Sequence, residues 1–194
     1  EGKLRADKGG CLLRLDDLLR FDKGQLLVLM PTHRFSSGLI AQTLKTLRQS
    51  KAEGVWLAAS FLWRGDDERR LARLQRLADT VSVPLIATND VLYHEPSRRA
   101  LQDVLTCIRE KKKLNEAGTL LAKNAERQLK PPREIERLFA LAPEAVEESV
   151  RFLDRISFSI DELCYEYPEE TADGFADPQT ALEHFVWEGI AKRY

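Results

Sequence analysis

The sequence lacks several features that define whole classes of protein. Its 194 residues contain no apolar run near the roughly 20 residues that a membrane span needs, and no secretory signal. Its three cysteines, Cys11, Cys107 and Cys164, are widely spaced and match no zinc-binding pattern. No glycine-rich phosphate loop is present. We therefore expect a cytoplasmic chain with reduced thiols and no membrane partner.

A strong charge imbalance is also missing. Lysine and arginine total 30 against 31 for aspartate and glutamate, a net charge of −1, whereas a dedicated nucleic-acid module is usually strongly basic. Hydrophobic residues make up 43%, enough for a globular core. The chain begins at Glu1 without a methionine and ends inside a helical pattern at Tyr194. We expect a piece of a longer protein.

What is present is an alternation of short apolar runs and amphipathic segments. The runs at residues 25–30, 55–59 and 84–88 are bounded by turn residues, as is typical of strands buried on both faces. Helical patterns separate them, and no hairpin signal occurs. The sequence therefore predicts an α/β fold with a parallel sheet. Four arginines of the second helical pattern are expected to face largely outward, namely Arg69, Arg70, Arg73 and Arg76.

The third run leads into the most informative stretch. A polar loop at residues 88–95 precedes a helix that opens at Pro96, with apolar positions at Leu101, Val104, Leu105 and Ile108. This pattern predicts a βα unit, and in parallel α/β folds function concentrates in the loops beyond the strand ends. After residue 109 the pattern predicts only helices, near 132–140, 143–156 and 178–194.

Three long segments carry a family resemblance. They are Ala87-Thr-Asn-Asp-Val-Leu-Tyr-His94 with the following Ser97-Arg-Arg-Ala-Leu-Gln-Asp-Val-Leu-Thr-Cys-Ile-Arg109, then Ala122-Lys-Asn-Ala-Glu-Arg-Gln-Leu-Lys-Pro-Pro132, and Phe158-Ser-Ile-Asp-Glu-Leu-Cys-Tyr-Glu-Tyr-Pro-Glu-Glu170. Together they resemble the late part of the PHP domain of error-prone bacterial C-family DNA polymerases, relatives of the polymerase III alpha subunit.

The resemblance implies a domain plan. Residues 1–157 would be the carboxyl-terminal part of the PHP domain, a distorted (β/α) barrel, of which three strands are too few to close the barrel. Residues 158–177 would be an acidic linker, and residues 178–194 the first helix of the polymerase palm. We therefore expect at least one strand edge that the rest of the protein covers.

PHP domains bind up to three metal ions, and the resemblance places one ligand motif, Asp-x-His, at Asp90. Leu92 replaces its histidine and offers no lone pair, so that ligand is lost. Asp90 and the nearby His94 remain candidate metal ligands. The ordinary alternatives are hydrogen bonding to loop amides or helix capping for Asp90, and a surface or capping role for His94. His33, at another strand exit, is expected to have a loop or capping role.

By the same resemblance, the parent protein transfers nucleotidyl groups from deoxynucleoside triphosphates to a primer end on DNA, with Mg²⁺ held by palm carboxylates. The implied role is translesion synthesis in DNA repair. Those carboxylates would follow residue 194, so we expect no polymerase catalytic residue in this chain. The acidic residues Asp161, Glu162, Glu166, Glu169 and Glu170 are interpreted as a solvated face.

Basic side chains gather between residues 98 and 133, and the candidates for phosphate contacts are Arg98, Arg99, Lys111, Lys112 and Lys113. The alternative is a solvated face balanced by nearby glutamates. Two other functions stay open. One is a metal-dependent PHP phosphoesterase or exonuclease that uses Asp90 and His94, with zinc, manganese or iron. The other is a non-catalytic module that binds accessory repair proteins through residues 111–156.

Overall fold

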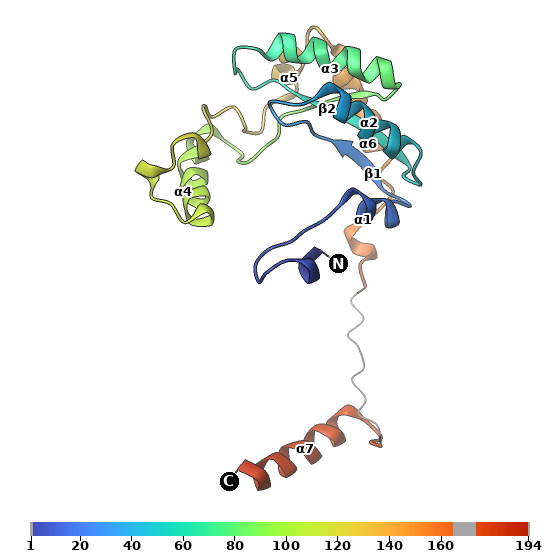
Figure 1. Ribbon diagram of the computed structural model, residues 1–194, viewed down its shortest axis with the longest axis vertical. Coiled ribbons are helices and arrows are strands. Elements are labelled where there is room, and N and C mark those ends of the chain that lie inside the picture. Colours follow the sequence, from blue (N-terminus) through green and yellow to red (C-terminus); the bar gives the residue numbers. More distant parts are fainter. Residues whose placement is uncertain (1, 165–173, 194) are drawn as a thin grey trace. The chain divides into compact units, whose positions relative to one another are not determined.

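The computed structural model describes residues 2–164 and 174–193. The chain divides into two compact units, residues 1–155 and residues 156–194. Figure 1 shows the order of their elements along the chain. No helix within the described residues has the length and apolar character needed to cross a membrane.

The first unit is built on a three-stranded parallel sheet. Its strands β1 (Leu26–Leu29), β2 (Gly54–Ser60) and β3 (Leu85–Thr88) lie side by side in the order β1-β2-β3. Leu27 pairs with Val55, and Leu57 pairs with Leu85. The predicted α/β class and parallel strands are confirmed, and the sheet is consistent with part of an α/β barrel.

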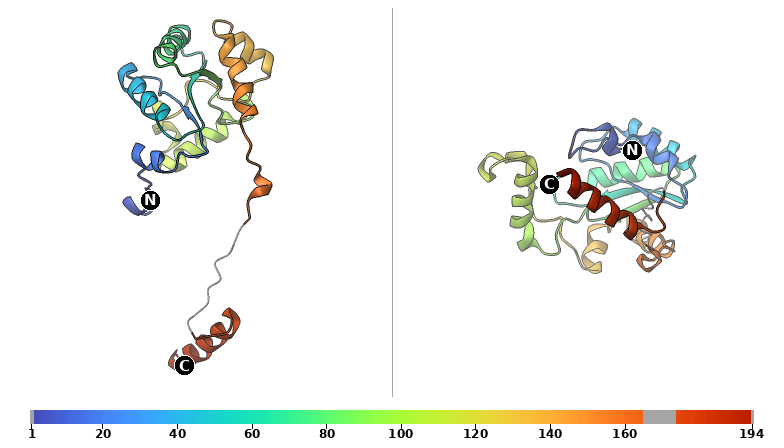
Figure 2. Two further views of the ribbon diagram at one scale, coloured as in Figure 1. Left: turned by 90° about the vertical axis from the view of Figure 1, so that its right-hand side faces the viewer. Right: turned by 90° about the horizontal axis from the view of Figure 1, so that it is seen from below.

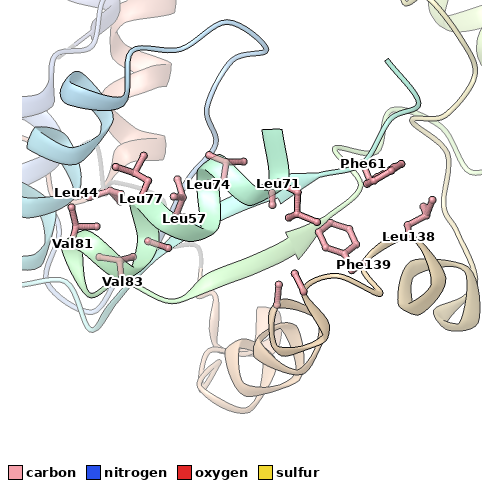
Figure 3. Packing of buried hydrophobic residues seen from close by; sticks show 14 residues of the cluster. Leu44, Leu57, Phe61, Leu71, Leu74, Leu77, Val81, Val83, Leu138 and Phe139 are labelled. Atoms are coloured by element: carbon pink, nitrogen blue, oxygen red, sulfur yellow. The ribbon is translucent and has the colours of Figure 1, made fainter. Parts of the chain in front are cut away.

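Helices α2 (Ser37–Arg48) and α3 (Asp67–Val81) supply the core on one face of the sheet. Leu44 of α2 and Leu74 of α3 are fully buried with Leu57 of β2 (Figure 3). Alternation along β2 sends Val55, Leu57 and Ala59 to this face. The apolar stripes of the two helices therefore pack on the alternate residues of β2 that face them.

Helix α6 (Pro143–Asp154) packs along β3, and helix α5 (Pro132–Leu138) packs against α6 (Figure 2, left). Phe139 and Ala145 join the same core as α3. On the opposite face of the sheet, the Trp56 ring is 1% exposed and meets Phe152 of α6 edge-on at 4.9 Å. Trp56 Nε1 donates to Glu148 Oε1 at 2.9 Å. These contacts fasten α6 to the middle strand.

One prediction is wrong for helix α4 (Arg99–Glu110), which follows the 3₁₀ turn η2 (Pro96–Arg98). The helix forms as the sequence indicates, but it does not cover the sheet (Figure 1). Its apolar positions are exposed, from 46% at Val104 to 68% at Ile108. The predicted βα packing is wrong because periodicity gives a helix an apolar face without determining what covers it.

Short elements complete the first unit: η1 (Gly2–Arg5), α1 (Leu15–Arg20), η3 (Leu114–Glu116) and η4 (Gly118–Leu120). The second unit, taken by itself, holds η5 (Ile160–Glu162) and α7 (Pro178–Arg193). Asp177 caps α7 by accepting from Thr180 N at 2.9 Å. Asp161 and Glu162 lie in η5, whereas Glu166, Glu169 and Glu170 lie outside the described residues.

Candidate functional site

A cavity lies where the three parallel strands end. Its volume is about 290 Å³, and it opens among the loops that leave β1, β2 and β3. Carboxyl ends of parallel strands share one edge of the sheet, which is the usual place for a site in this class of fold. The lining residues are Met30, Pro31, Thr32, His33, Ala58, Ser60, Leu62, Arg64, Arg70, Thr88 and Asp90.

The loop after β2 is organised by one buried carboxylate. Asp67, at the first position of α3, accepts hydrogen bonds from the backbone N–H groups of Leu62, Arg64 and Gly65. Gly65 has φ of 94°, a conformation that glycine adopts without strain. Asp67 thus bonds back to the loop that precedes the helix. These bonds fix the backbone position from which the Arg64 side chain extends.

Two of the four α3 arginines turn toward the loop after β1. Arg70 Nη2 donates to the carbonyl of Pro31 at 3.0 Å, and Arg73 Nη2 donates to that of Phe35 at 3.0 Å. Burial and the neighbouring charge of Arg64 hold the pKa of Arg70 below its ordinary value, against the opposing effect of Asp66 and Asp67. The prediction that the arginines face outward is therefore wrong for Arg70, which lines the cavity.

Asp90 lies at the end of β3 and carries a specific partner. Its Oδ1 forms an ion pair with Arg127 Nη2 at 2.8 Å, and Arg127 Nε donates to the Asp90 carbonyl at 2.7 Å. The backbone of Asp90 has φ of 47°, in the left-handed region. The three predicted roles for Asp90, namely metal binding, hydrogen bonding to loop amides and helix capping, did not include this arginine.

The segment that carries Arg127 runs beside the loop after β3. Leu92 N donates to the Arg127 carbonyl at 2.8 Å, and Leu129 N donates to the Tyr93 carbonyl at 3.1 Å. Asn89 Nδ2 donates to the Glu126 carbonyl at 3.1 Å. These bonds join residues nearly 40 positions apart, so spacing along the sequence gave no sign of them.

The two histidines near the strand exits, His33 and His94, differ in position. The His94 side chain is 65% exposed, 3.9 Å from Glu95, and lines a separate hollow beside Leu101. It does not share the cavity with Asp90. His33 does line the cavity; its Nε2 lies 3.8 Å from Asp66 Oδ2, while its buried Nδ1 has no partner within the described chain.

A multi-metal centre does not fit these residues as they are placed. No group of three or more His, Cys, Asp or Glu side chains that could hold a metal ion occurs in residues 2–164 and 174–193. The carboxylate of Asp90 is engaged by Arg127, and Leu92 offers no ligand atom. The arginines Arg64 and Arg70 place positive charge where a cation would sit.

The predicted basic candidates divide into paired and unpaired groups. Arg98 lies 3.3 Å from Glu95, and Arg99 lies 3.6 Å from Asp103. Lys111, Lys112 and Lys113 are exposed where α4 ends, and no ion pair is formed by them in the described part of the chain. Among the candidates, these three lysines are therefore both exposed and without an ion pair in the described part of the chain.

Comparison with known proteins adds an independent finding. No protein-family model matches the chain. The error-prone DNA polymerase of Bradyrhizobium sp. (strain ORS 278) is 57% identical over 187 residues, which are 96% of this chain and 16% of that protein. The error-prone DNA polymerase of Rhodopseudomonas palustris (strain BisB5) is 51% identical over 193 residues, 100% of this chain and 17% of that protein.

A relative with lower sequence identity shows the same pattern of coverage. Error-prone DNA polymerase 1 of Agrobacterium fabrum (strain C58 / ATCC 33970) is 42% identical over 193 residues, 100% of this chain and 18% of that protein. The similarity thus covers nearly all of the chain but a small share of each relative. The chain is therefore similar over nearly its whole length to bacterial error-prone DNA polymerases, of which it spans about one sixth, and the resemblance noted in its sequence is confirmed.

Proposed function

We propose that this chain is a structural layer of an error-prone DNA polymerase and holds none of the carboxylates that carry out nucleotidyl transfer. Its similarity to one sixth of each polymerase relative is the observation that carries this proposal. In the proposed division, residues 1–157 are the late part of a PHP domain, residues 158–177 a linker and residues 178–194 the first palm helix.

The activity belongs to the longer protein in this proposal. That protein would act in the cytoplasm and join deoxynucleoside triphosphates to a primer end on damaged DNA. Palm carboxylates outside this chain would hold its Mg²⁺ ions, which align the primer hydroxyl and the triphosphate. The side chains described above then serve to hold the sheet and its loops in place.

The exposed apolar face of α4 supports a scaffold role. Leu101, Leu105 and Ile108 are each more than half exposed on one helix, a pattern that usually marks a surface covered by another part of a protein. The relatives are about six times longer than this chain, so other segments of the polymerase are available to cover it. We propose that the polymerase's own chain is the occupant.

A primer-extension assay tests the division of labour. The purified chain, supplied with Mg²⁺, deoxynucleoside triphosphates and a primed template, should extend no primer. The full-length polymerase under the same conditions is the positive control. Extension that persists in the chain after stringent purification would overturn the proposal.

A stability assay tests the covering of α4. Leu101→Glu with Ile108→Glu should leave the far-ultraviolet circular dichroism of the chain unchanged, because both side chains already face solvent. The same pair should lower the melting temperature of the full-length polymerase, whereas Arg109→Glu on the same helix should not. If accessory repair proteins cover α4 instead, the melting temperature will not change.

The three accessible lysines remain candidates for DNA contact. Replacing Lys111, Lys112 and Lys113 by glutamine should flatten the salt dependence of DNA binding by the full-length polymerase, by about 0.9 in log–log slope per lost phosphate contact. An unchanged slope would assign them to the solvated face instead.

A further inference from the structure

The cavity at the strand ends combines buried polar atoms that lack a partner with two guanidinium groups that form no ion pair within the described residues. Arg64 has no side-chain ion pair within the described residues, and its charge lies close enough to Arg70 to lower the pKa of that residue. Asp90 is paired with Arg127, whereas Asp66 and Asp67 act on Arg70 through their charge without forming an ion pair with it. Within the described residues the cavity therefore keeps two guanidinium groups that form no ion pair.

Buried donor atoms around the cavity also have no partner in the part of the chain that the structure describes. They are the hydroxyl oxygen of Thr88, Nε of Arg70 and Nδ1 of His33, which donates in one of the two neutral ring tautomers. Each belongs to a residue that lines the cavity, and they come from the end of β3, from α3 and from the loop after β1. The buried Oδ1 of Asp66, an acceptor outside the cavity lining, also has no partner within the described residues. A buried polar atom is normally hydrogen-bonded, so several unpaired donors around one cavity indicate a bound group that accepts hydrogen bonds.

We propose that this cavity binds a phosphate-type oxyanion, as free phosphate or the terminal group of a small phosphate ester, without a metal ion. The guanidinium groups of Arg64 and Arg70 would hold its charge, because arginine N–H groups match the geometry of phosphate oxygens. The hydroxyl of Thr88 would donate a further hydrogen bond. The proposal does not depend on the polymerase function proposed above.

The carboxylate of Asp90 in the cavity wall should determine which anion the site prefers. Asp90 lines the same cavity and can only accept hydrogen bonds when it is ionised. Protonated phosphate has a P–OH group to donate to such an oxygen, whereas sulfate near neutral pH has none. The site should therefore prefer phosphate to sulfate.

An adjoining hollow extends the positive surface. It has a volume of about 210 Å³ and shares His33, Leu62 and Arg64 with the first cavity, while Lys123 and Arg127 line its other side. A ligand with two linked phosphates can reach both hollows, so a diphosphate should bind more tightly than a single phosphate.

Isothermal titration of the purified chain with inorganic phosphate, in metal-free buffer with a chelator, tests the site. Phosphate should bind and sulfate should bind more weakly. Arg64→Ala should weaken phosphate binding at least about tenfold, the size expected for one charge-assisted hydrogen bond. Arg69→Ala, on the outward side of the same helix as Arg70, is the matched control and should change the affinity less than about twofold.

Several outcomes would overturn the proposal: no phosphate binding, equal affinities in Arg64→Ala and Arg69→Ala, or binding that requires added Mn²⁺. Circular dichroism checks that each variant folds. Should Arg64→Ala misfold, Thr88→Val takes its place, because it removes one hydroxyl and conserves volume. Unchanged affinity in a folded Thr88→Val chain would equally refute the site.

Discussion

Gly54 leaves less room for a side chain than any other described glycine, and its replacement by alanine tests the packing of α6 on the sheet. A methyl group at Gly54 would overlap the Trp56 ring and come within 2.9 Å of Arg155 Nη1. The ring is nearly fully buried and donates to Glu148, so it has little room to shift. We therefore expect Gly54→Ala to break the contact between β2 and α6.

The expected change in the free energy of unfolding is the balance of opposing effects. Alanine in a strand would otherwise stabilise by about 0.5–1 kcal/mol, because it restricts the unfolded chain more than glycine does. Overpacking costs about 1–3 kcal/mol, and loss of a hydrogen bond to a charged group costs about 1.5–3 kcal/mol. The clash should dominate, with a net loss of about 2–4 kcal/mol in the free energy of unfolding.

Urea denaturation followed by circular dichroism measures this loss. Gly38→Ala in α2 is the control, since its nearest neighbour atom would be 3.9 Å away, and it should stabilise by up to about 1 kcal/mol. In a Trp56→Leu background the cost of Gly54→Ala should largely vanish, because the ring is gone. A Gly54→Ala chain as stable as the wild type would refute this description of the packing.

Three further predictions concern single side chains. Burial acts to raise the pKa of Glu148, but hydrogen bonds from an indole N–H and an arginine outweigh it and hold that pKa below the ordinary 4.5. Its contribution to stability should be complete above pH about 4.5 and disappear as pH falls through the lowered value. Urea midpoints across acidic pH should show this loss in the wild type but not in Glu148→Gln. Phe139→Ala should cost about 3–5 kcal/mol in urea denaturation because the ring is 1% exposed, and a loss below about 1 kcal/mol would place it outside the core. Asp67→Ala removes three hydrogen bonds to the loop after β2, so trypsin should cut faster after Arg64; an unchanged rate would show that the loop is held otherwise.

Much of the fold followed from local patterns. Each strand is a short apolar run between turn residues, and the helix bearing Leu74 has an apolar stripe that fits one face of a sheet. Such signals depend only on neighbours along the chain, so the sequence predicts them well. The α4 helix was likewise expected, but its partner surface was not, because periodicity does not identify the covering element.

The cavity was harder to predict, because its contacts join distant residues. Asp90 meets Arg127 across 37 positions, and Arg70 reaches the carbonyl of Pro31 across 39. Arg70 lies four positions before the buried Leu74, about one helical turn, so it stands beside the apolar stripe of α3 rather than opposite it. That adjacency was the one local sign that this arginine would turn inward.

A measurement of metal binding by the purified, untagged chain most directly distinguishes the proposed structural role from that of a metal-dependent phosphoesterase. Equilibrium dialysis against Zn²⁺ and Mn²⁺ gives the amount bound, and Asp90→Asn tests whether it lies at the strand ends. The arginine-lined cavity and the ion pair of Asp90 predict no stoichiometric ion at this site. A tightly bound ion that disappears in Asp90→Asn would contradict the proposal.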